Sequence, residues 1–162
     1  MSTVYLETSV TSYLAANPSR DLVTAAHQQV TRDWWQTVRD HYELYISELV
    51  LEEISAGDAS LASRRQELVA DLPILQYSDD VASLVEVFEQ RLGLSGRAKV
   101  DLPHFAFAVS YEIDYLVTWN CAHIANGEVI RRLMTATMQL SRFCPAILTP
   151  NELMGNTGGD VP

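Results

Sequence analysis

The sequence predicts an α/β fold in which helices pack on a short, mainly parallel sheet. Two observations support this class. Short apolar segments typical of strands alternate with longer amphipathic segments typical of helices, and the 162 residues contain no internal repeat. Parallel strands need long crossover connections, so the alternation favours a parallel sheet. The length gives room for one domain with a sizeable core, rather than two small ones.

The chain begins with a predicted strand over residues 3–6, whose β-prone side chains end at Glu7. The polar residues from Glu7 onward can leave the sheet and cap a helix. A long amphipathic helix is predicted over 21–41, because this segment lacks Gly and Pro and carries apolar side chains at a spacing of four. That predicted apolar stripe consists of Leu22, Ala26, Val30, Trp34 and Val38.

Residues 44–46 form the second predicted strand, and Ser47 is the expected N-cap of the helix that follows it. Gly57 is the expected end of that helix. Residues 59–70 are predicted to be helical, and residues 73–77 to be a brief extended segment.

The second half continues the alternation of helices and strands. Helices are predicted over 79–92, 98–113 and 127–140, and strands over 115–119 and 146–149. The helix over 98–113 should be buried along one face, because apolar side chains recur there at helical spacing. These side chains are Leu102, Phe105, Ala106, Val109 and Ile113.

The composition is that of a soluble globular protein. Hydrophobic residues make up 48% of the chain and charged residues 20%, which excludes a disordered acidic tail or a membrane protein. No targeting signal is visible and the two cysteines share no metal-ligand spacing, so we expect reduced thiols and a cytoplasmic location.

The charge is strongly acidic, with a net value of −10. This value argues against binding to nucleic acid through a broad basic surface, and it favours a basic protein partner. The surplus of acids lies almost wholly before residue 97. An anionic ligand is therefore expected to dock near Arg97 and Lys99, the only lysine in the chain.

Several oxygen-bearing side chains fall where predicted strands end or helices begin. Glu7 ends the first strand, Glu53 lies in the helix after the second, Asp101 begins a helix, and Asn120 ends a later strand. Glu53 shares the inward face of its helix, whereas Glu52 is turned about 100° away. In a parallel sheet such residues meet at the carboxyl edge of the strands. Carboxylates that meet there repel one another unless a cation neutralises them, which points to Mg²⁺ or Mn²⁺.

Each of these residues also has an ordinary structural interpretation. Glu7 and Asp101 can be helix N-terminal acids, Glu53 can belong to a solvated acidic face, and Asn120 is a common loop residue. His104 can contact an RNA phosphate or relay a proton, although a bond to a nearby carbonyl is the more usual role of a helix histidine.

With these residues the sequence resembles the PIN-domain family, and within it the VapC-type toxins of prokaryotic toxin–antitoxin pairs. The similarity covers roughly residues 3–154 and rests on five motifs in order. These are Val4-Tyr5-Leu6-Glu7-Thr8-Ser9-Val10; Ser47 followed by Glu53-Ile54; Asp101-Leu102-Pro103-His104-Phe105-Ala106-Phe107-Ala108; Asp114-Tyr115-Leu116-Val117-Thr118-Trp119-Asn120; and Ile147-Leu148-Thr149-Pro150-Asn151-Glu152-Leu153.

The resemblance implies a three-layer α/β/α domain over 1–154, and the Gly-rich, polar end of the chain predicts a flexible tail over 155–162. It also implies a cytoplasmic endoribonuclease dependent on Mg²⁺ or Mn²⁺ that forms homodimers, is inhibited by a small antitoxin protein and has no membrane partner. Its metal ligands and catalytic residues would be Glu7, Glu53, Asp101 and Asn120. Its substrate-binding residues would be Thr118, which could orient a metal-bound water, and Arg97, Lys99 and His104.

Three departures from the family pattern leave an alternative open. Glu7 is one methylene longer than the usual Asp, Pro103 stands where Ala is common, and Asn120 removes one charge. A proline inside a helix beginning at Arg97 would kink it, whereas in a helix beginning near residue 102 it is harmless. The alternative is therefore a catalytically impaired PIN-fold module that binds RNA or an antitoxin without cleavage. A phosphate-binding regulator of the flavodoxin type is disfavoured, because no Gly-rich loop follows the first strand.

Overall fold

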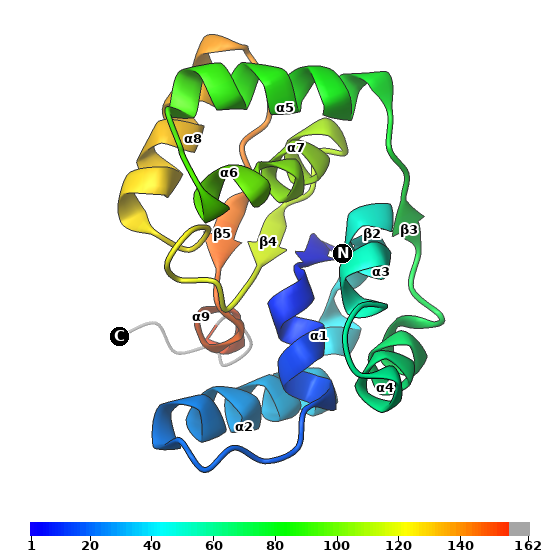
Figure 1. Ribbon diagram of the computed structural model, residues 1–162. Coiled ribbons are helices and arrows are strands. Elements are labelled where there is room, and N and C mark those ends of the chain that lie inside the picture. The colour runs from blue at the N-terminus through cyan, green and yellow to red at the C-terminus, as the bar shows by residue number, and fades with distance from the viewer. Residues whose placement is uncertain (156–162) are drawn as a thin grey trace.

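A computed structural model of the chain, which describes residues 1–155, has a three-layer α/β/α fold around a five-stranded parallel sheet (Figure 1). The strands are ordered β3-β2-β1-β4-β5. Their bounds are Thr3–Leu6 for β1, Glu43–Ser47 for β2, Ile74–Leu75 for β3, Tyr115–Val117 for β4 and Ala146–Leu148 for β5. The central strand β1 pairs with β2 and β4, with Tyr5 opposite Tyr45 and Leu116. The carboxyl ends of β1, β2 and β4 therefore lie side by side.

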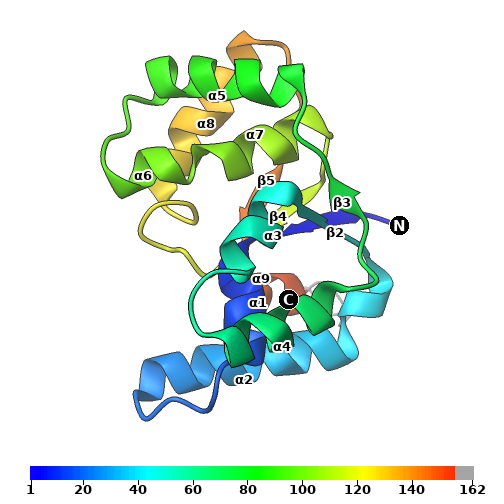
Figure 2. The same cartoon turned by 45° about the vertical axis from the view of Figure 1, so that its right-hand side comes forward.

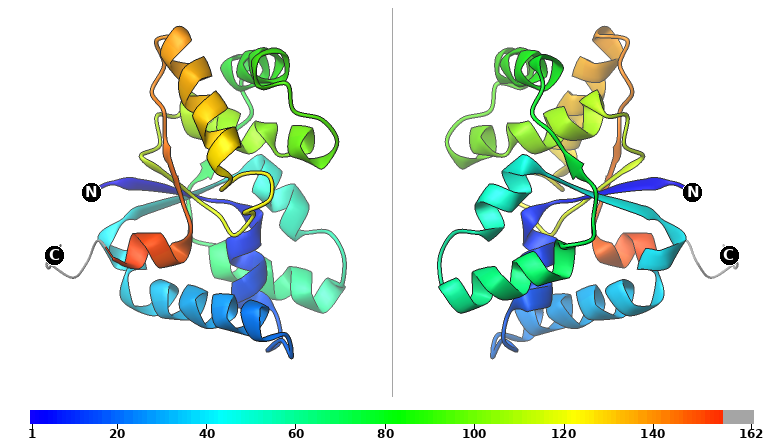
Figure 3. Two further views of the ribbon diagram at one scale, coloured as in Figure 1. Left: turned by 90° about the vertical axis from the view of Figure 1, so that its left-hand side faces the viewer. Right: turned by 90° about the vertical axis from the view of Figure 1, so that its right-hand side faces the viewer.

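Two helical layers cover the sheet, as Figures 2 and 3 show from three further sides. One layer contains α1, Thr8–Ala15; α2, Leu22–Thr37; α4, Ala59–Val69; and α9, Pro150–Met154. The other contains α5, Asp79–Leu92; α6, Arg97–Val100; α7, Leu102–Ser110; and α8, Gly127–Gln139. The remaining helix α3, Glu48–Ile54, begins directly after β2, with Ser47 as its N-cap, and a 3₁₀ helix covers Arg39–His41. None of the helices within residues 1–155 has the length and apolarity that crossing a bilayer would need.

The apolar stripe predicted for the helix over 21–41 is wrong in its first half. Leu22 is 85% exposed and Ala26 is also exposed, whereas Gln28, Thr31 and Trp34 are buried. A spacing of four residues turns about 40° further around the helix at each step, so a long run at that spacing winds off the buried face. The helix also ends at Thr37, before the 3₁₀ helix.

The helix predicted over 98–113 is two helices that meet at Asp101. Pro103 occupies the first turn of α7, where its missing N–H and fixed φ are tolerated. The five side chains predicted to be buried along this segment are indeed buried, and those of α7 pack against α5. The proline is therefore harmless in α7, and Asp101 lies at the junction of α6 and α7.

One hydrophobic core includes strands and helices from both halves of the chain. Its largest fully buried side chains include Trp34, Tyr5, Phe88 and Phe105. Cys121 and Cys144 are free thiols, as expected. Of the predicted tail over 155–162, residues 156–162 lie outside the described residues.

Candidate functional site at the carboxyl edge of the sheet

Glu7 follows the last residue of the central strand β1 and caps α1. Its Oε2 atom accepts hydrogen bonds from the backbone N–H of Ser9 at 3.1 Å, from the Ser9 hydroxyl, and from Thr118 Oγ1 at 2.7 Å. The residue is only 5% exposed. Within residues 1–155 no hydrogen bond reaches its Oε1 atom, so one carboxylate oxygen is fixed and the other is left for a ligand.

Glu53 reaches the same region from α3. Its Oε2 atom accepts a hydrogen bond from the Thr8 hydroxyl and lies 3.3 Å from His104 Nε2. Burial raises the pKa of Glu53, but the contacts with His104 and Thr8 outweigh burial, so its pKa lies below the ordinary value. Glu53 therefore remains ionised at neutral pH.

His104 comes from α7 and is fully buried. Its Nδ1 atom lies 2.8 Å from the Tyr5 hydroxyl, which lies 2.8 Å from Ser47 Oγ. Burial lowers the pKa of His104, but Glu53, Glu7 and Asp101 outweigh burial and raise it. Burial raises the pKa of Tyr5 well above its ordinary value, so this hydroxyl stays protonated. The imidazole is thus fixed on one side and faces carboxylates on the other.

Asp101 and Asn120 form a second pair beside this group. Asn120 Nδ2 donates to Asp101 Oδ2 at 3.1 Å, and Asn120 Oδ1 accepts from the His123 backbone N–H at 3.0 Å. Burial raises the pKa of Asp101, His104 and Asn120 act in the opposite direction, and the negative charge of Glu7 raises it further. Asp101 therefore shares the electrostatic environment of Glu7.

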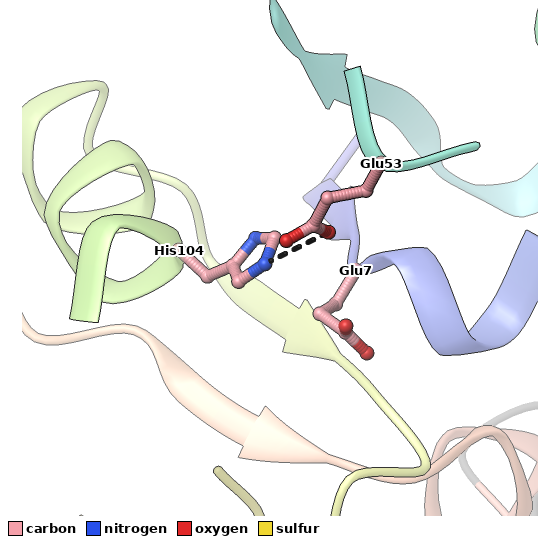
Figure 4. Close-up of side chains that lie close together, drawn as sticks. All are labelled: Glu7, Glu53 and His104. Carbon is pink, nitrogen blue, oxygen red and sulfur yellow. Dashed lines mark ion pairs between the residues drawn. The ribbon is translucent and has the colours of Figure 1, made fainter. Parts of the chain in front are cut away.

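The residues able to hold a metal ion come from three separate elements (Figure 4). Within residues 1–155, one group of His, Cys, Asp and Glu side chains brings its ligand atoms within 4.8 Å of one another: Glu7, Glu53 and His104. Two carboxylates and an imidazole are a donor set that binds a divalent ion. The buried His104 Nε2 atom has no partner in hydrogen-bond geometry, which leaves it available as a further ligand.

An open hollow of about 460 Å³ adjoins Asp101 and Asn120 and is also lined by Arg97, Val100 and His123. Arg97 is exposed, and no ion pair joins it to another residue of the described chain. Lys99 instead lies 3.5 Å from Glu89 on α5. Of the two predicted basic contacts, Arg97 is therefore the one that faces the acidic site.

The structure places the predicted site residues in three groups. Glu7 and Glu53 converge, Asp101 pairs with Asn120 beside them, and Thr118 holds Glu7. Thr118 and His104 are both fully buried, and Thr118 donates to Glu7, so their roles in substrate binding stay predictions. Contrary to expectation, the His104 side chain bonds no backbone carbonyl within residues 1–155: its Nδ1 atom pairs with Tyr5, and its Nε2 atom lies 3.3 Å from Glu53.

Four polar residues of the site belong to the sequence motifs but were given no site role from the sequence: Thr8, Ser9, Tyr5 and Ser47. Thr8 and Ser9 directly follow Glu7, so the sequence already places their hydroxyl groups close to the Glu7 carboxylate. Tyr5 and Ser47 gave no such signal, because in a strand and at a cap these residue types are ordinary. Their roles depend on the register that sets Tyr5 near the end of β2.

No family model matches the chain, and no curated protein matches it.

Proposed function

We propose that this protein is a divalent-metal-dependent endoribonuclease that hydrolyses RNA phosphodiester bonds. The observation that supports it most is the convergence of Glu7 and Glu53 on His104, with the Asp101–Asn120 pair beside them, at the carboxyl edge of a parallel sheet. Ligands of α/β proteins bind at this edge. RNA is proposed as the substrate class because the five sequence motifs, in their order, resemble those of the PIN-domain ribonucleases.

The donor chemistry fits a divalent ion, which when bound would activate water and offset negative charge on the scissile phosphate. The protein's own part is positioning. Ser9 and Thr118 fix one oxygen of Glu7, Thr8 fixes one oxygen of Glu53, and Asn120 orients Asp101. Arg97, at the rim of the hollow, would contact an RNA phosphate. Asp101 and Asn120 as direct ligands remain predictions.

The biological setting is part of the same proposal. The motif similarity supports a toxin of a type II toxin–antitoxin pair, acting as a homodimer in the cytoplasm. The net charge of −10 favours a basic antitoxin protein as the inhibitor. Free RNA should bind weakly without metal, because among residues 1–155 Arg97 is the one arginine or lysine that lines the hollow beside Asp101.

Cleavage of a structured RNA tests the proposal. Purified protein with Mn²⁺ should cut the RNA, a chelator should stop the reaction, and Glu53→Ala and Asp101→Asn should each abolish it. Glu52→Ala is the matched control, since Glu52 is the exposed neighbour on the same helix and should leave cleavage intact. Cleavage that survives both site changes would reject the assignment.

One observation favours a second candidate, a PIN-fold binding module that does not cleave. His104 can neutralise Glu53 at 3.3 Å, so the site can hold its charge without a metal ion. Calorimetry separates the candidates. The nuclease should release or absorb heat with Mn²⁺, whereas a folded protein that gives no heat at millimolar Mn²⁺ would favour the binding module.

A further inference from the structure

His104 is buried among the acids of the site, and one of its ring nitrogens, Nε2, has no hydrogen-bond partner within the described residues. The Nε2 atom makes no hydrogen bond of acceptable geometry, although no part of the ring is exposed to solvent. An unsatisfied buried polar atom costs about 1–3 kcal/mol, so such an atom calls for an explanation. Its nearest charged neighbour is Glu53 Oε2, at 3.3 Å, and Glu7 completes the group of three (Figure 4).

We propose that His104 Nε2 is a direct ligand of the metal ion, together with Glu7 and Glu53, and that the site therefore selects a transition-metal ion over Mg²⁺. This inference deepens the proposed nuclease function and rests on it. Mg²⁺ prefers oxygen ligands and a regular octahedron, whereas imidazole nitrogen suits transition-metal ions. One nitrogen among the donors thus shifts the preference of the site.

The distances agree with one ion shared by the three side chains. Ligand atoms about 2.1 Å from an ion lie about 3 Å apart when they are adjacent and about 4.2 Å apart when they are opposite. The 3.3 Å between His104 Nε2 and Glu53 Oε2 fits adjacent ligands, and all three ligand atoms lie within 4.8 Å of one another, a limit wider than 4.2 Å, so a bound ion would draw the group slightly together. Little rearrangement is needed for the three to meet at an ion.

The other ring nitrogen of His104, Nδ1, has the hydrogen-bond partner that metal-binding histidines usually have. A metal-bound histidine usually donates its second N–H to a polar partner, which fixes the ring and its tautomer. His104 Nδ1 lies 2.8 Å from the Tyr5 hydroxyl, and Ser47 Oγ, 2.8 Å beyond, can accept the Tyr5 proton. With Nδ1–H donating to Tyr5 in this way, the lone pair of Nε2 points at the acids.

The carboxylates of Glu7 and Glu53 are also oriented by hydrogen bonds from neighbouring side chains. Glu7 uses Oε2 to accept from Ser9 and Thr118, and Glu53 uses Oε2 to accept from Thr8. Within the described chain, no hydrogen bond reaches Oε1 of either glutamate, which leaves one free oxygen on each. Three side chains from three elements are thus each held by hydrogen bonds, and Glu53 Oε2, the oxygen near His104 Nε2, keeps the lone pair that Thr8 does not use.

A competing explanation gives His104 only an electrostatic role, as a buried cation that balances Glu53. The two explanations make opposite predictions for His104→Asn. An asparagine amide can keep a polar contact with Tyr5 at the position of Nδ1 but has no atom at the position of Nε2. Loss of a ligand lowers Mn²⁺ affinity, whereas loss of a competing cation raises it.

The test is Mn²⁺ and Mg²⁺ binding to the full chain, followed by calorimetry and by pulsed electron paramagnetic resonance of bound Mn²⁺. Wild type should show the ¹⁴N coupling of a directly bound imidazole and should prefer Mn²⁺ to Mg²⁺. His104→Asn should lose the coupling and at least about tenfold in Mn²⁺ affinity relative to Mg²⁺. His41→Asn, which changes an exposed histidine in the 3₁₀ helix, should retain both properties.

Bound Mn²⁺ without ¹⁴N coupling in wild type, or an Mn²⁺ affinity that is unchanged or higher in His104→Asn, would overturn the inference. The wild-type spectrum decides the question even if His104→Asn does not fold. If bound Mn²⁺ has oxygen ligands only and RNA is still cleaved, His104 is not a ligand but the proposed nuclease function stands. Nitrogen-bound Mn²⁺ without RNA cleavage would support the ligand and reject the nuclease.

Discussion

The Nε2 atom of His104 lies 3.3 Å from the Oε2 atom of Glu53, and the imidazole has no exposure to solvent. This contact joins α7 to α3 at the edge of the sheet where Glu7 follows β1. A buried histidine among carboxylates needs a partner in either protonation state: a carboxylate for the charged ring, or a donor or metal ion for the lone pair of the neutral ring. The contact therefore links the stability of the fold to the chemistry of the site.

The Tyr5 hydroxyl should contribute to both stability and metal binding. Tyr5→Phe keeps the ring but removes the partner of His104 Nδ1 and of Ser47 Oγ. We expect the free energy of unfolding to fall by about 1–3 kcal/mol, because buried polar atoms lose their bonds. Mn²⁺ affinity should fall by about 10- to 100-fold. Denaturant unfolding and calorimetry measure these changes.

Tyr45→Phe is the control for Tyr5→Phe. Tyr45 lies opposite Tyr5 on the neighbouring strand, and the one hydrogen bond of its hydroxyl within the described residues is a long, exposed contact with Glu43 at 3.4 Å. This variant should change neither quantity appreciably. Equal effects of the two substitutions would contradict the role given to Tyr5.

Thr118 should act through Glu7. Thr118→Val removes the donor to Glu7 Oε2 and the acceptor of the Asn120 backbone N–H while keeping a similar shape. Mn²⁺ affinity should fall by about 10- to 100-fold, because Glu7 loses one of the groups that orient it. Calorimetry with Thr137→Val gives the comparison: this equally buried threonine bonds backbone carbonyls within α8 and should not affect Mn²⁺ binding. An unchanged affinity in Thr118→Val would remove Thr118 from the site.

Pro103 should be neutral for the site and mildly stabilising for the fold. It lies in the first turn of α7, so Pro103→Ala breaks no hydrogen bond and mainly increases the freedom of the unfolded chain. The free energy of unfolding should fall by about 0.4–1 kcal/mol, and Mn²⁺ affinity should stay the same. A large gain in Mn²⁺ affinity or in RNA cleavage would instead indicate that the proline impairs the site.

The ion pair between Asp80 and Arg142 should make stability depend on acid pH. Arg142 and the Ser110 hydroxyl lower the pKa of Asp80 from 3.8 to about 2. Because the pKa is lower in the folded state, the stabilisation is complete above about pH 4 and disappears as the pH falls through about 2. Both side chains are partly exposed, so the pair should contribute at most about 1 kcal/mol.

Urea unfolding of wild type and Asp80→Asn at several pH values measures this contribution. The variant should be less stable at pH 7, and the difference should shrink toward pH 2. A difference that is constant over this range would show that the Asp80 charge is not its source.

Most elements of the fold could be predicted because each has a local cause. The α5 helix over Asp79–Leu92 has apolar residues at helical spacing and a glycine in the left-handed conformation at its end. The buried face of α2 was not predictable in this way, because Gln28 and Thr31 find their partners outside the helix. Gln28 bonds Ser19 and Asn17, and Thr31 accepts a bond from Trp119.

The same limit applies to the site. Glu7 and Glu53 could be chosen as candidates because each follows a strand, and parallel strands bring such residues together. His104 was expected to bond a carbonyl, since the sequence places it on an apolar helix without showing what that helix faces. Its actual partners, Tyr5 and Glu53, are set by the packing of α7 against β1 and α3, which no local pattern encodes.

The most direct test of the metal-dependent nuclease is a Mn²⁺ titration of chelator-treated protein, with RNA cleavage and metal binding measured in the same samples. Cleavage of an end-labelled structured RNA should be zero without metal and should rise in proportion to bound Mn²⁺. Glu53→Gln should lose both binding and cleavage, whereas Glu52→Gln should retain both. Cleavage that is independent of bound Mn²⁺, or saturated Mn²⁺ binding without any cleavage, would contradict the proposed function.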